Sequence, residues 1–320
     1  MTRIAAIDVG TNTAEILVAD VSDGSIRPVY DDERFVRLGA GVDASGRVNE
    51  DALQRLKEAL IVLRDAAEEH GAEAIIVGGT SASRDAANQK EIVAFVRRET
   101  GLDYEILSGD EEATWTFVAA CAAVDALTGR CAVLDIGGGS TEIIIGQGDV
   151  RGPEAIAYRR SFNIGTVRLT ERFFDAQPPD PAAVDRAEAF IDETLRSADV
   201  PLAAETPVIG NSGTAVALAL INAGPEAAWD DLDADQRVLS AEAVRGWRER
   251  LLGATFDEVM ALHPTVMQGR ADIFPMGLVI LDRILQQAGV GAFRVSPYQL
   301  RHGLLFRWMA ERGTPQSPAE

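Results

Sequence analysis

The stretch VLDIGGGSTEIIIG, at residues 133–146, decides which fold this chain predicts. It places three consecutive glycines, and then Ser140, Thr141 and Glu142, between two apolar runs of the kind that form β-strands. A hairpin turn needs only one or two glycines. A second stretch, AIDVGTNTAEILVADV at residues 6–21, repeats the same order of apolar strand, glycine-bearing turn and apolar strand. The pair predicts that the chain contains two similar units.

Both stretches are followed by alternating helix and strand patterns. The similarity is long and weak, which indicates a duplicated α/β lobe and not a short solenoid repeat. We therefore predict a first lobe over residues 1–127, a second over 128–305, and a helix end with a disordered tail over 306–320. Two such lobes would leave an interdomain cleft, where small-molecule sites tend to lie.

The composition is that of a folded, acidic and lysine-poor protein. The 320 residues carry a net charge of -20, and only Lys57 and Lys90 are lysines. This charge disfavours duplex nucleic acid as a partner, because such proteins need a basic footprint. The acidic, arginine-rich composition fits either a salty cytoplasm, where acidic surfaces keep proteins soluble, or a GC-rich genome. The sequence leaves these two explanations open.

The chain shows the features of a cytoplasmic protein. Its longest apolar runs fall far below the roughly 20 residues of a membrane helix, so we expect no membrane span. The N-terminus enters a strand directly, without the pattern of a signal peptide. Cys121 and Cys131 form no CxxC pair and lie near no histidine, so we expect small core residues and neither a disulfide nor a metal site.

The paired turns have the chemistry of phosphate binding. Glycine lets the backbone approach a ligand, and successive N–H groups with hydroxyls form a concave anion site. Asp8 and Asp135 precede the turns and can hold Mg²⁺ (or Mn²⁺), which then bridges phosphate oxygens. The residues expected to bind phosphate are Gly10, Thr11, Asn12, Thr13, Arg37, Gly137, Gly138, Gly139, Ser140 and Thr141.

Eight motifs together carry a resemblance to a known family. In chain order they are AIDVGTNT…ILVADV, VGGTSASRDA, LSGDEEA, VLDIGGGSTEIIIG, FNIGTVRL, GNSGTA, RADIFPMGLVIL and VSPYQLRHGLL. Over nearly its whole length the chain resembles the exopolyphosphatase / guanosine pentaphosphate phosphohydrolase family, in a short two-domain form. The resemblance implies two ribonuclease H-like lobes of the actin-like ATPase type. It also implies release of terminal orthophosphate from inorganic polyphosphate or guanosine pentaphosphate, with Mg²⁺ or Mn²⁺.

The resemblance also implies catalytic residues. In SGDEEATWTF, a first-lobe glutamate orients the attacking water; we prefer Glu111 to Glu112, although the helix dipole alone explains two carboxylates at a helix start. Glu142 is expected to hold the metal or to share in activating water. Arg84, just beyond a buried strand, is expected to hold phosphate through its planar guanidinium.

A third glycine-bearing turn, VIGNSGTAV, lacks the GK[ST] end of a P-loop. Its residues Gly210, Ser212, Gly213 and Thr214 are expected to bind a nucleotide or more of a polyphosphate chain, or else to form a tight strand-to-helix packing turn. Further candidates for a local positive track are Arg159, Arg160, Arg168, Arg270, Arg301 and His302.

Two residues depart from the family pattern, and other functions remain as alternatives. Glu15 follows the first turn where larger or neutral residues are common, and Gln299 stands where glycine is usual. A Glu15 facing the cleft would repel phosphate. The alternatives to hydrolysis are a non-catalytic sensor that binds the alarmone or polyphosphate, and an actin-like ATPase or kinase. Because the chain lacks the extra helical domain of longer members, it leaves surface that a homodimer could cover.

Overall fold

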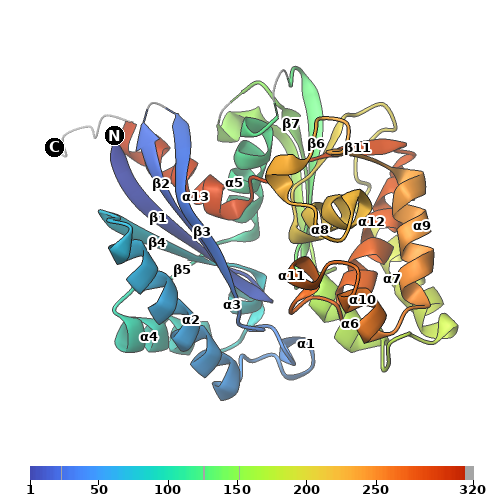
Figure 1. Ribbon diagram of the computed structural model, residues 1–320, viewed down its shortest axis with the longest axis horizontal. Coiled ribbons are helices and arrows are strands. Elements are labelled where there is room, and N and C mark those ends of the chain that lie inside the picture. Colours follow the sequence, from blue (N-terminus) through green and yellow to red (C-terminus); the bar gives the residue numbers. More distant parts are fainter. Residues whose placement is uncertain (23, 125–126, 151, 314–320) are drawn as a thin grey trace. The chain divides into compact units, whose positions relative to one another are not determined.

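The computed structural model describes residues 1–22, 24–124, 127–150 and 152–313 (Figure 1). The chain forms two compact units: unit 1 is Met1–Ala119 with the chain from Tyr298 on, and unit 2 is Ala120–Pro297. These limits differ from the predicted boundaries at 127 and 305. Of the segment predicted as a helix end with a disordered tail, residues 306–313 belong to a helix, and 314–320 lie outside the described residues.

Unit 1 contains a sheet in the order β3-β2-β1-β4-β5. Its strands are β1 (Thr2–Val9), β2 (Thr13–Ser22), β3 (Ser25–Phe35), β4 (Ala74–Gly79) and β5 (Glu105–Ile106). β1, β2 and β3 form an antiparallel meander, whereas β4 runs parallel to β1 and β5 runs parallel to β4. The first predicted turn therefore connects two central, neighbouring strands.

Helices cover both faces of this sheet (Figure 1). They are α1 (Val42–Ser45), α2 (Glu50–Glu69), α3 (Ser81–Asp85), α4 (Gln89–Thr100), α5 (Gly109–Ala122) and α13 (Leu300–Gly313). Because side chains alternate along a strand, Ala5, Ile7 and Val9 join the core that α2 and α4 close. Ile4 and Ala6 instead join a second core, which α13 closes.

The C-terminal helix α13 explains why the predicted boundaries differ from the observed units. Its residues Leu300, Leu304 and Leu305 are buried in the second core of unit 1. A Cβ atom on Gly303 would lie 2.4 Å from the carbonyl oxygen of Trp115, so α13 needs this glycine to approach α5 closely. The chain end thus returns to the first sheet, a long-range contact that no local pattern announces.

Unit 2 contains a sheet in the order β10-β11-β9-β6-β7-β8. Its strands are β6 (Arg130–Ile136), β7 (Thr141–Gln147), β8 (Ile156–Phe162), β9 (Val208–Gly210), β10 (Val238–Ser240) and β11 (Ala292–Val295). From β8 to β11 the order and strand directions repeat those of unit 1, and β10 adds an antiparallel edge. The predicted α/β class with two ribonuclease H-like, actin-like lobes is confirmed.

The largest hydrophobic cluster of unit 2 includes Ala132 and Leu134 of β6 and Ile143 and Ile145 of β7, which share one face of this sheet. Its helices are α6 (Thr166–Phe173), α7 (Pro181–Arg196), α8 (Gly213–Ala223), α9 (Ala241–Leu252), α10 (Phe256–Met260), α11 (Pro264–Met267) and α12 (Phe274–Ala288), with 3₁₀ turns η1 (Pro153–Ala155) and η2 (Trp229–Asp231). Cys121 and Cys131 are buried, with their Sγ atoms 3.8 Å apart. Across the described ranges, no helix is long and apolar enough to cross a membrane.

Candidate active site

The first turn, between β1 and β2, is held from behind by the loop at residues 36–39. The carbonyl oxygen of Asn12 accepts from backbone N–H groups 36 and 37, at 2.9 and 2.8 Å, and that of Thr11 accepts from the N–H of Gly39 at 2.9 Å. In a trans peptide the C=O and N–H bonds point in opposite directions, so these contacts turn the following N–H groups away from the loop. Arg37 adopts a φ of 43°, a strained conformation for a non-glycine residue.

The second turn is held from behind by a helix. The carbonyl oxygens of Gly137 and Gly138 accept from the backbone N–H groups of residues 166–168, at 2.8–3.1 Å, where α6 begins. The oxygen of Gly139 accepts from the Nε of Arg168 at 2.7 Å. All three glycine carbonyls are therefore turned toward α6, and the N–H groups that follow them are turned away. Successive N–H groups directed to one side are the arrangement that an anion-binding turn requires.

Both turns depend on a glycine in the segment behind them. A Cβ atom on Gly165 would lie 2.4 Å from the oxygen of Gly138, and one on Gly39 would lie 2.2 Å from the Cγ2 of Thr11. Sequence analysis did not single out either glycine. Their signal is present in the motifs FNIGTVRL and VRLGAG, each of which places a glycine where a second segment must approach the turn.

Each turn is flanked by an acidic pair that occupies the same position in its hairpin. Asp8 lies opposite Glu15 in the β1–β2 register, and Asp135 lies opposite Glu142 in the β6–β7 register. Directly opposite residues point to the same face of a sheet. Sequence analysis treated Glu15 as a departure from the family pattern and missed this equivalence. The shared spacing of DVGTNTAE and DIGGGSTE could have revealed it.

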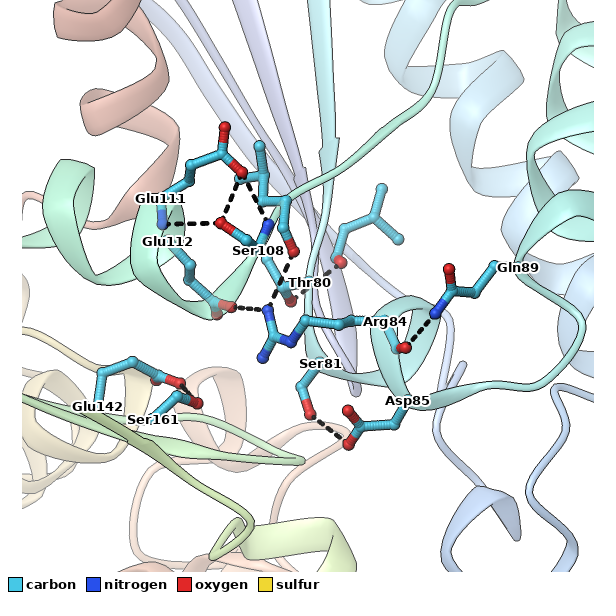
Figure 2. Close-up of polar contacts among 12 residues, drawn as sticks. Thr80, Ser81, Arg84, Asp85, Gln89, Ser108, Glu111, Glu112, Glu142 and Ser161 are labelled. Carbon is cyan, nitrogen blue, oxygen red and sulfur yellow. Dashed lines mark hydrogen bonds and ion pairs between the residues drawn. The ribbon is translucent and has the colours of Figure 1, made fainter. Parts of the chain in front are cut away.

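The two glutamates of these pairs have different surroundings. The Oε1 of Glu15 accepts from the Oγ1 of Thr13 at 3.0 Å, and its Oε2 is ion-paired with Arg301. Glu142 is only 1% exposed and accepts from the Oγ of Ser161, on β8, at 2.6 Å (Figure 2). Beside the second turn, the buried Glu142 carboxylate therefore contacts a hydroxyl, whereas beside the first the Glu15 carboxylate contacts both a hydroxyl and a guanidinium.

The carboxylates fit a hard divalent cation that also contacts substrate. Within the described residues, no group of three or more His, Cys, Asp and Glu side chains is placed to hold a metal ion. Mg²⁺ nevertheless suits this donor set, because it binds through one or two carboxylates and takes its other ligands from water and phosphate. Asp135 and Glu142 are such a pair in unit 2, and Asp8 has the position equivalent to Asp135 in unit 1.

The adjacent glutamates at the start of α5 have different surroundings (Figure 2). Glu111 is exposed, and its Oε2 accepts from the backbone N–H and the Oγ of Ser108, at 2.9 and 2.7 Å. The backbone N–H of Glu111 donates to the same hydroxyl at 3.2 Å. This reciprocal pattern is a capping box. The Ser108 hydrogen bonds lower the pKa of Glu111, so its carboxylate is committed to the helix end.

Glu112 is the buried member of the two. It is 7% exposed, and its Oε2 accepts from the Nη1 of Arg84 at 2.5 Å. Burial raises the pKa of Glu112 above its usual range, and the charge of Arg84 opposes this rise. A buried carboxylate with one arginine partner has the properties of a general base. The geometry therefore favours Glu112 over Glu111, the reverse of the preference drawn from sequence.

Arg84 is positioned by the short helix α3, directly after β4 (Figure 2). Its Nη1 also donates to the carbonyl oxygen of Leu107 at 3.2 Å. The neighbouring Ser83 is anchored by a 2.6 Å contact between its Oγ and the phenol oxygen of Tyr104. That phenol lies so close to Gly79 that a Cβ atom there would be 2.3 Å from it. Tyr104 fixes the end of β4 and the start of α3, a function that sequence analysis missed.

Residues 17–312 match the Ppx/GppA phosphatase family. The chain belongs to this family. It is 33% identical over 320 residues to exopolyphosphatase 2 of Mycobacterium tuberculosis, covering 95% of this chain and 98% of that relative. It is 30% identical to a guanosine-5'-triphosphate,3'-diphosphate pyrophosphatase of Vibrio vulnificus, covering 96% of this chain but 59% of the relative.

Solved structures of the family share the fold. A crystal structure of an exopolyphosphatase-like protein superposes with a TM-score of 0.88 and 29% identity, covering 98% of this chain and 99% of that one. An exopolyphosphatase from Cytophaga hutchinsonii gives a TM-score of 0.85 at 28% identity, with the same coverage. The Aquifex aeolicus Ppx/GppA family member gives 0.77 at 26% identity, covering 98% and 99%.

The third turn of this family member makes capping and packing contacts. Ser212 caps α8, because its Oγ accepts from the backbone N–H of Ala215 at 3.2 Å. Gly210 lacks space for a side chain, since a Cβ atom would lie 3.0 Å from the Phe293 ring. Thr214 lies against Gly277, where a Cβ atom would be 2.8 Å from its methyl group. Within the same unit, a guanidinium nitrogen of Arg270 would lie 3.3 Å from a Cβ on Gly213.

Three candidates for the positive track have other contacts. Arg168 binds the carbonyl of Gly139, and Arg301 binds Glu15 and Asp31. His302 is buried and stacks on Tyr298, with ring centroids 4.2 Å apart. Burial, with the charge of Arg301, holds the pKa of His302 well below its usual range, so this side chain is neutral at pH 7. Arg159 and Arg160, on β8, are exposed.

Proposed function

We propose that this family member hydrolyses the terminal phosphoanhydride bond of inorganic polyphosphate and releases orthophosphate. The main supporting observation is that the buried Glu112 carboxylate accepts a hydrogen bond from the Arg84 guanidinium. In the same unit, the carbonyls of the first turn are hydrogen-bonded to the loop at residues 36–39. A relative that matches this chain almost end to end is an exopolyphosphatase, whereas the guanosine pyrophosphatase extends well beyond it. Polyphosphate is therefore the first candidate substrate, and guanosine pentaphosphate the second.

The chemistry requires an oriented water and offset charge more than covalent catalysis. In the proposed step, water attacks the terminal phosphorus, the bridging P–O bond breaks, and the shortened chain leaves with the electron pair. Glu112 orients the water and accepts its proton. Arg84 holds Glu112 and offsets negative charge on the phosphoryl group being transferred. The turn N–H groups and hydroxyls bind phosphate oxygens.

A divalent cation, Mg²⁺ or Mn²⁺, would supply neutralisation of charge on the phosphate oxygens. Asp135 and Glu142 are the residues that would hold it in unit 2, because they lie opposite each other in the register. Asp8 has the equivalent place in unit 1. The Ser161 hydroxyl keeps the buried Glu142 carboxylate hydrogen-bonded and fixes its orientation.

The decisive test exchanges one oxygen for nitrogen at each neighbouring glutamate. Orthophosphate release from long-chain polyphosphate, with Mg²⁺, is measured for the wild type, Glu112→Gln and Glu111→Gln. Loss of a general base lowers kcat by about 10²–10⁴-fold. We expect this loss for Glu112→Gln, whereas Glu111→Gln keeps kcat within about threefold and weakens only the helix cap. A loss confined to Glu111→Gln would contradict the assignment.

The same assay separates the alternatives. Guanosine pentaphosphate and ATP are tested beside polyphosphate, each with Mg²⁺ and with Mn²⁺. Faster release from ATP than from the other two substrates supports an actin-like ATPase or kinase. Binding of polyphosphate or guanosine pentaphosphate without any release by the wild type supports a non-catalytic sensor. Release from guanosine pentaphosphate alone moves the substrate assignment but keeps the proposed roles of Glu112 and Arg84.

The pH profile of kcat/KM gives a second readout on Glu112. A base must be ionised, so activity falls as the pH drops through the pKa of Glu112, which burial raises above its usual range. Arg84→Met removes the charge that opposes this rise, and the acid limb then moves to higher pH. Profiles are normalised to their plateaus, because Arg84→Met also lowers the maximum rate. An unmoved limb would show that another group titrates.

A further inference from the structure

An acidic side chain on β2, beside the first turn, would be expected to oppose phosphate binding. Glu15 lies directly opposite Asp8, and like charges in this position destabilise a sheet. The Oε1 of Glu15 is 3.0 Å from the Oγ1 of Thr13, a residue of the turn itself. A carboxylate at this distance from a phosphate-binding hydroxyl would repel a polyanion unless a cation offsets it.

Arg301, on α13, is the cation that offsets this charge. Its guanidinium is ion-paired with the Oε2 of Glu15, and its Nε and Nη2 donate to the Oδ2 of Asp31 at 3.2 and 3.1 Å. The Arg301 side chain is only 13% exposed. Burial alone would lower the pKa of Arg301, but the charges of Glu15, Asp31 and Asp8 raise it above its ordinary value. Arg301 therefore stays charged among three carboxylates.

The two departures from the family pattern meet at this guanidinium. The Nη1 of Arg301 donates both to Glu15 and to the Oε1 of Gln299. Gln299 is itself fixed, because its backbone N–H donates to the Nδ1 of His302 at 3.3 Å. A carboxylate on β2 and an amide before α13 are thus coupled through one arginine, although they lie far apart in the sequence.

We propose that Arg301 is a charge-balancing, positioning residue of the first phosphate turn. It holds Glu15 so that this carboxylate orients the Thr13 hydroxyl and does not repel substrate phosphate. Gln299 fixes the guanidinium in that place. The inference rests on the proposed function, in which the first turn binds phosphate. Arg301 acts through Glu15 and does not touch substrate.

The test is a charge rescue measured on polyphosphate hydrolysis. Arg301→Met leaves three carboxylates beside the turn without this counter-charge, so KM rises about tenfold while kcat changes less than about threefold. Adding Glu15→Gln to Arg301→Met removes one negative charge and keeps an acceptor for Thr13. KM of the double variant returns to within about threefold of wild type. Arg301→Lys keeps the charge and keeps most of the affinity.

The matched control lies two turns further along the same helix. Arg307 bridges Glu105, at 2.9 and 3.0 Å, and Glu311, at 2.8 Å, much as Arg301 bridges its two carboxylates. Arg307→Met removes an arginine from α13 without touching the phosphate turn, so KM stays at the wild-type value. Equal rises in KM for Arg301→Met and Arg307→Met would show that the effect is loss of helix packing, and would overturn the inference.

Other results also decide the inference. An unchanged KM for Arg301→Met, or a double variant as weak as the single one, overturns it. Calorimetric binding of polyphosphate to the same variants gives the same order whether or not the wild type turns over. A wild type that binds but does not hydrolyse therefore removes the proposed catalysis and leaves this inference testable. A wild type that binds no polyphosphate overturns both.

Discussion

The hairpins β1–β2 and β6–β7 have the same arrangement of acidic residues but differ in the contacts that each glutamate makes. Both place an Asp and a Glu opposite each other, on either side of a glycine-bearing turn. In the first, Glu15 is held by Arg301, which comes from the far end of the chain. In the second, the buried Glu142 is held by the hydroxyl of Ser161 on the neighbouring strand. The same duplicated position thus carries a carboxylate that contacts an arginine in one unit and a buried carboxylate that contacts a serine hydroxyl in the other.

The hairpins also differ in what lies behind their turns. The loop that contains the strained Arg37 donates hydrogen bonds to the carbonyls of the first turn, whereas the N-terminus of α6 donates to those of the second. A helix start offers several N–H donors in one direction. The run GGG at residues 137–139 turns its three carbonyls toward such donors and toward the α6 arginine. In the first turn, the carbonyls of Thr11 and Asn12 accept from the loop at 36–39.

The largest expected difference between the hairpins is in the two glutamates. Glu142→Gln removes a carboxylate proposed to hold the cation, so kcat at saturating polyphosphate falls about a hundredfold or more. Glu15→Gln keeps hydrogen-bond acceptors beside Thr13 and Arg301, and changes kcat less than about tenfold. Phosphate release is measured over a range of Mg²⁺ concentrations for both variants. Glu142→Gln shifts the Mg²⁺ dependence to higher concentration, whereas Glu15→Gln leaves it in place. The opposite order would place the cation at the first hairpin.

An intermediate effect is expected from the glycines behind the turns. Gly165→Ala brings a Cβ within 2.4 Å of the backbone of residues 138 and 139, and neither of these glycines has a side chain that can move aside. Overpacking of this kind costs about 1–3 kcal/mol. We expect a lower Tm and a loss of phosphate release that no second substitution in the turn restores.

The matched change in the first hairpin should be reversible. Gly39→Ala brings a Cβ within 2.2 Å of the Thr11 methyl group, whereas the other atoms nearby are at 3.3 Å or more. Thr11→Ser removes that methyl group and keeps the hydroxyl. The double variant Thr11→Ser/Gly39→Ala therefore recovers Tm and activity relative to Gly39→Ala alone. If the double variant recovers neither Tm nor activity, the backbone of the loop at 36–39 cannot shift to accept a Cβ atom, as expected for the backbone behind the second turn.

The sequence predicts the hairpins well because their signals are local. Apolar strands, a run of turn residues and an Asp at the strand end all lie within about ten neighbouring residues. The equivalence of Glu15 and Glu142 could also be predicted from the sequence, since the spacing from Asp to Glu is the same in both hairpins. The choice between Glu111 and Glu112 is less well determined by the sequence, for a different reason. Adjacent helix residues point about 100° apart, and local sequence does not fix which of them faces Arg84.

Long-range partners could not be predicted in this way. No local pattern near LRHGLLFRW indicates that its helix packs on the first sheet. The limits of the two units and the contact between Arg301 and Glu15 could therefore not be predicted from the sequence. The same limit applies to Arg168. As a surface arginine it suggested a positive track, yet its Nε holds a carbonyl of the second turn. Such contacts depend on tertiary packing, which local pattern does not encode.

The smallest expected difference concerns the arginines behind the turns. Arg168 donates directly to the carbonyl of Gly139 at 2.7 Å, whereas Arg55 donates to Val36 and Arg37, at 2.9 and 3.2 Å, in the loop one step behind the first turn. Arg168→Met frees a turn carbonyl to face substrate, so KM for polyphosphate rises about fivefold, on the order of 1 kcal/mol. Arg55→Met loosens only the support, and KM rises about twofold.

The control for these two arginines is Arg64, whose Nη1 donates to the carbonyl of Thr100 at 2.8 Å, at the end of α4. Arg64→Met removes an arginine-to-carbonyl contact of the same kind away from both turns, so it leaves KM unchanged. An Arg55→Met effect equal to that of Arg168→Met would mean that the loop transmits strain to its turn as fully as direct contact does. The strained Arg37, whose carbonyl Arg55 holds, would then be the element that sets the shape of the first phosphate turn.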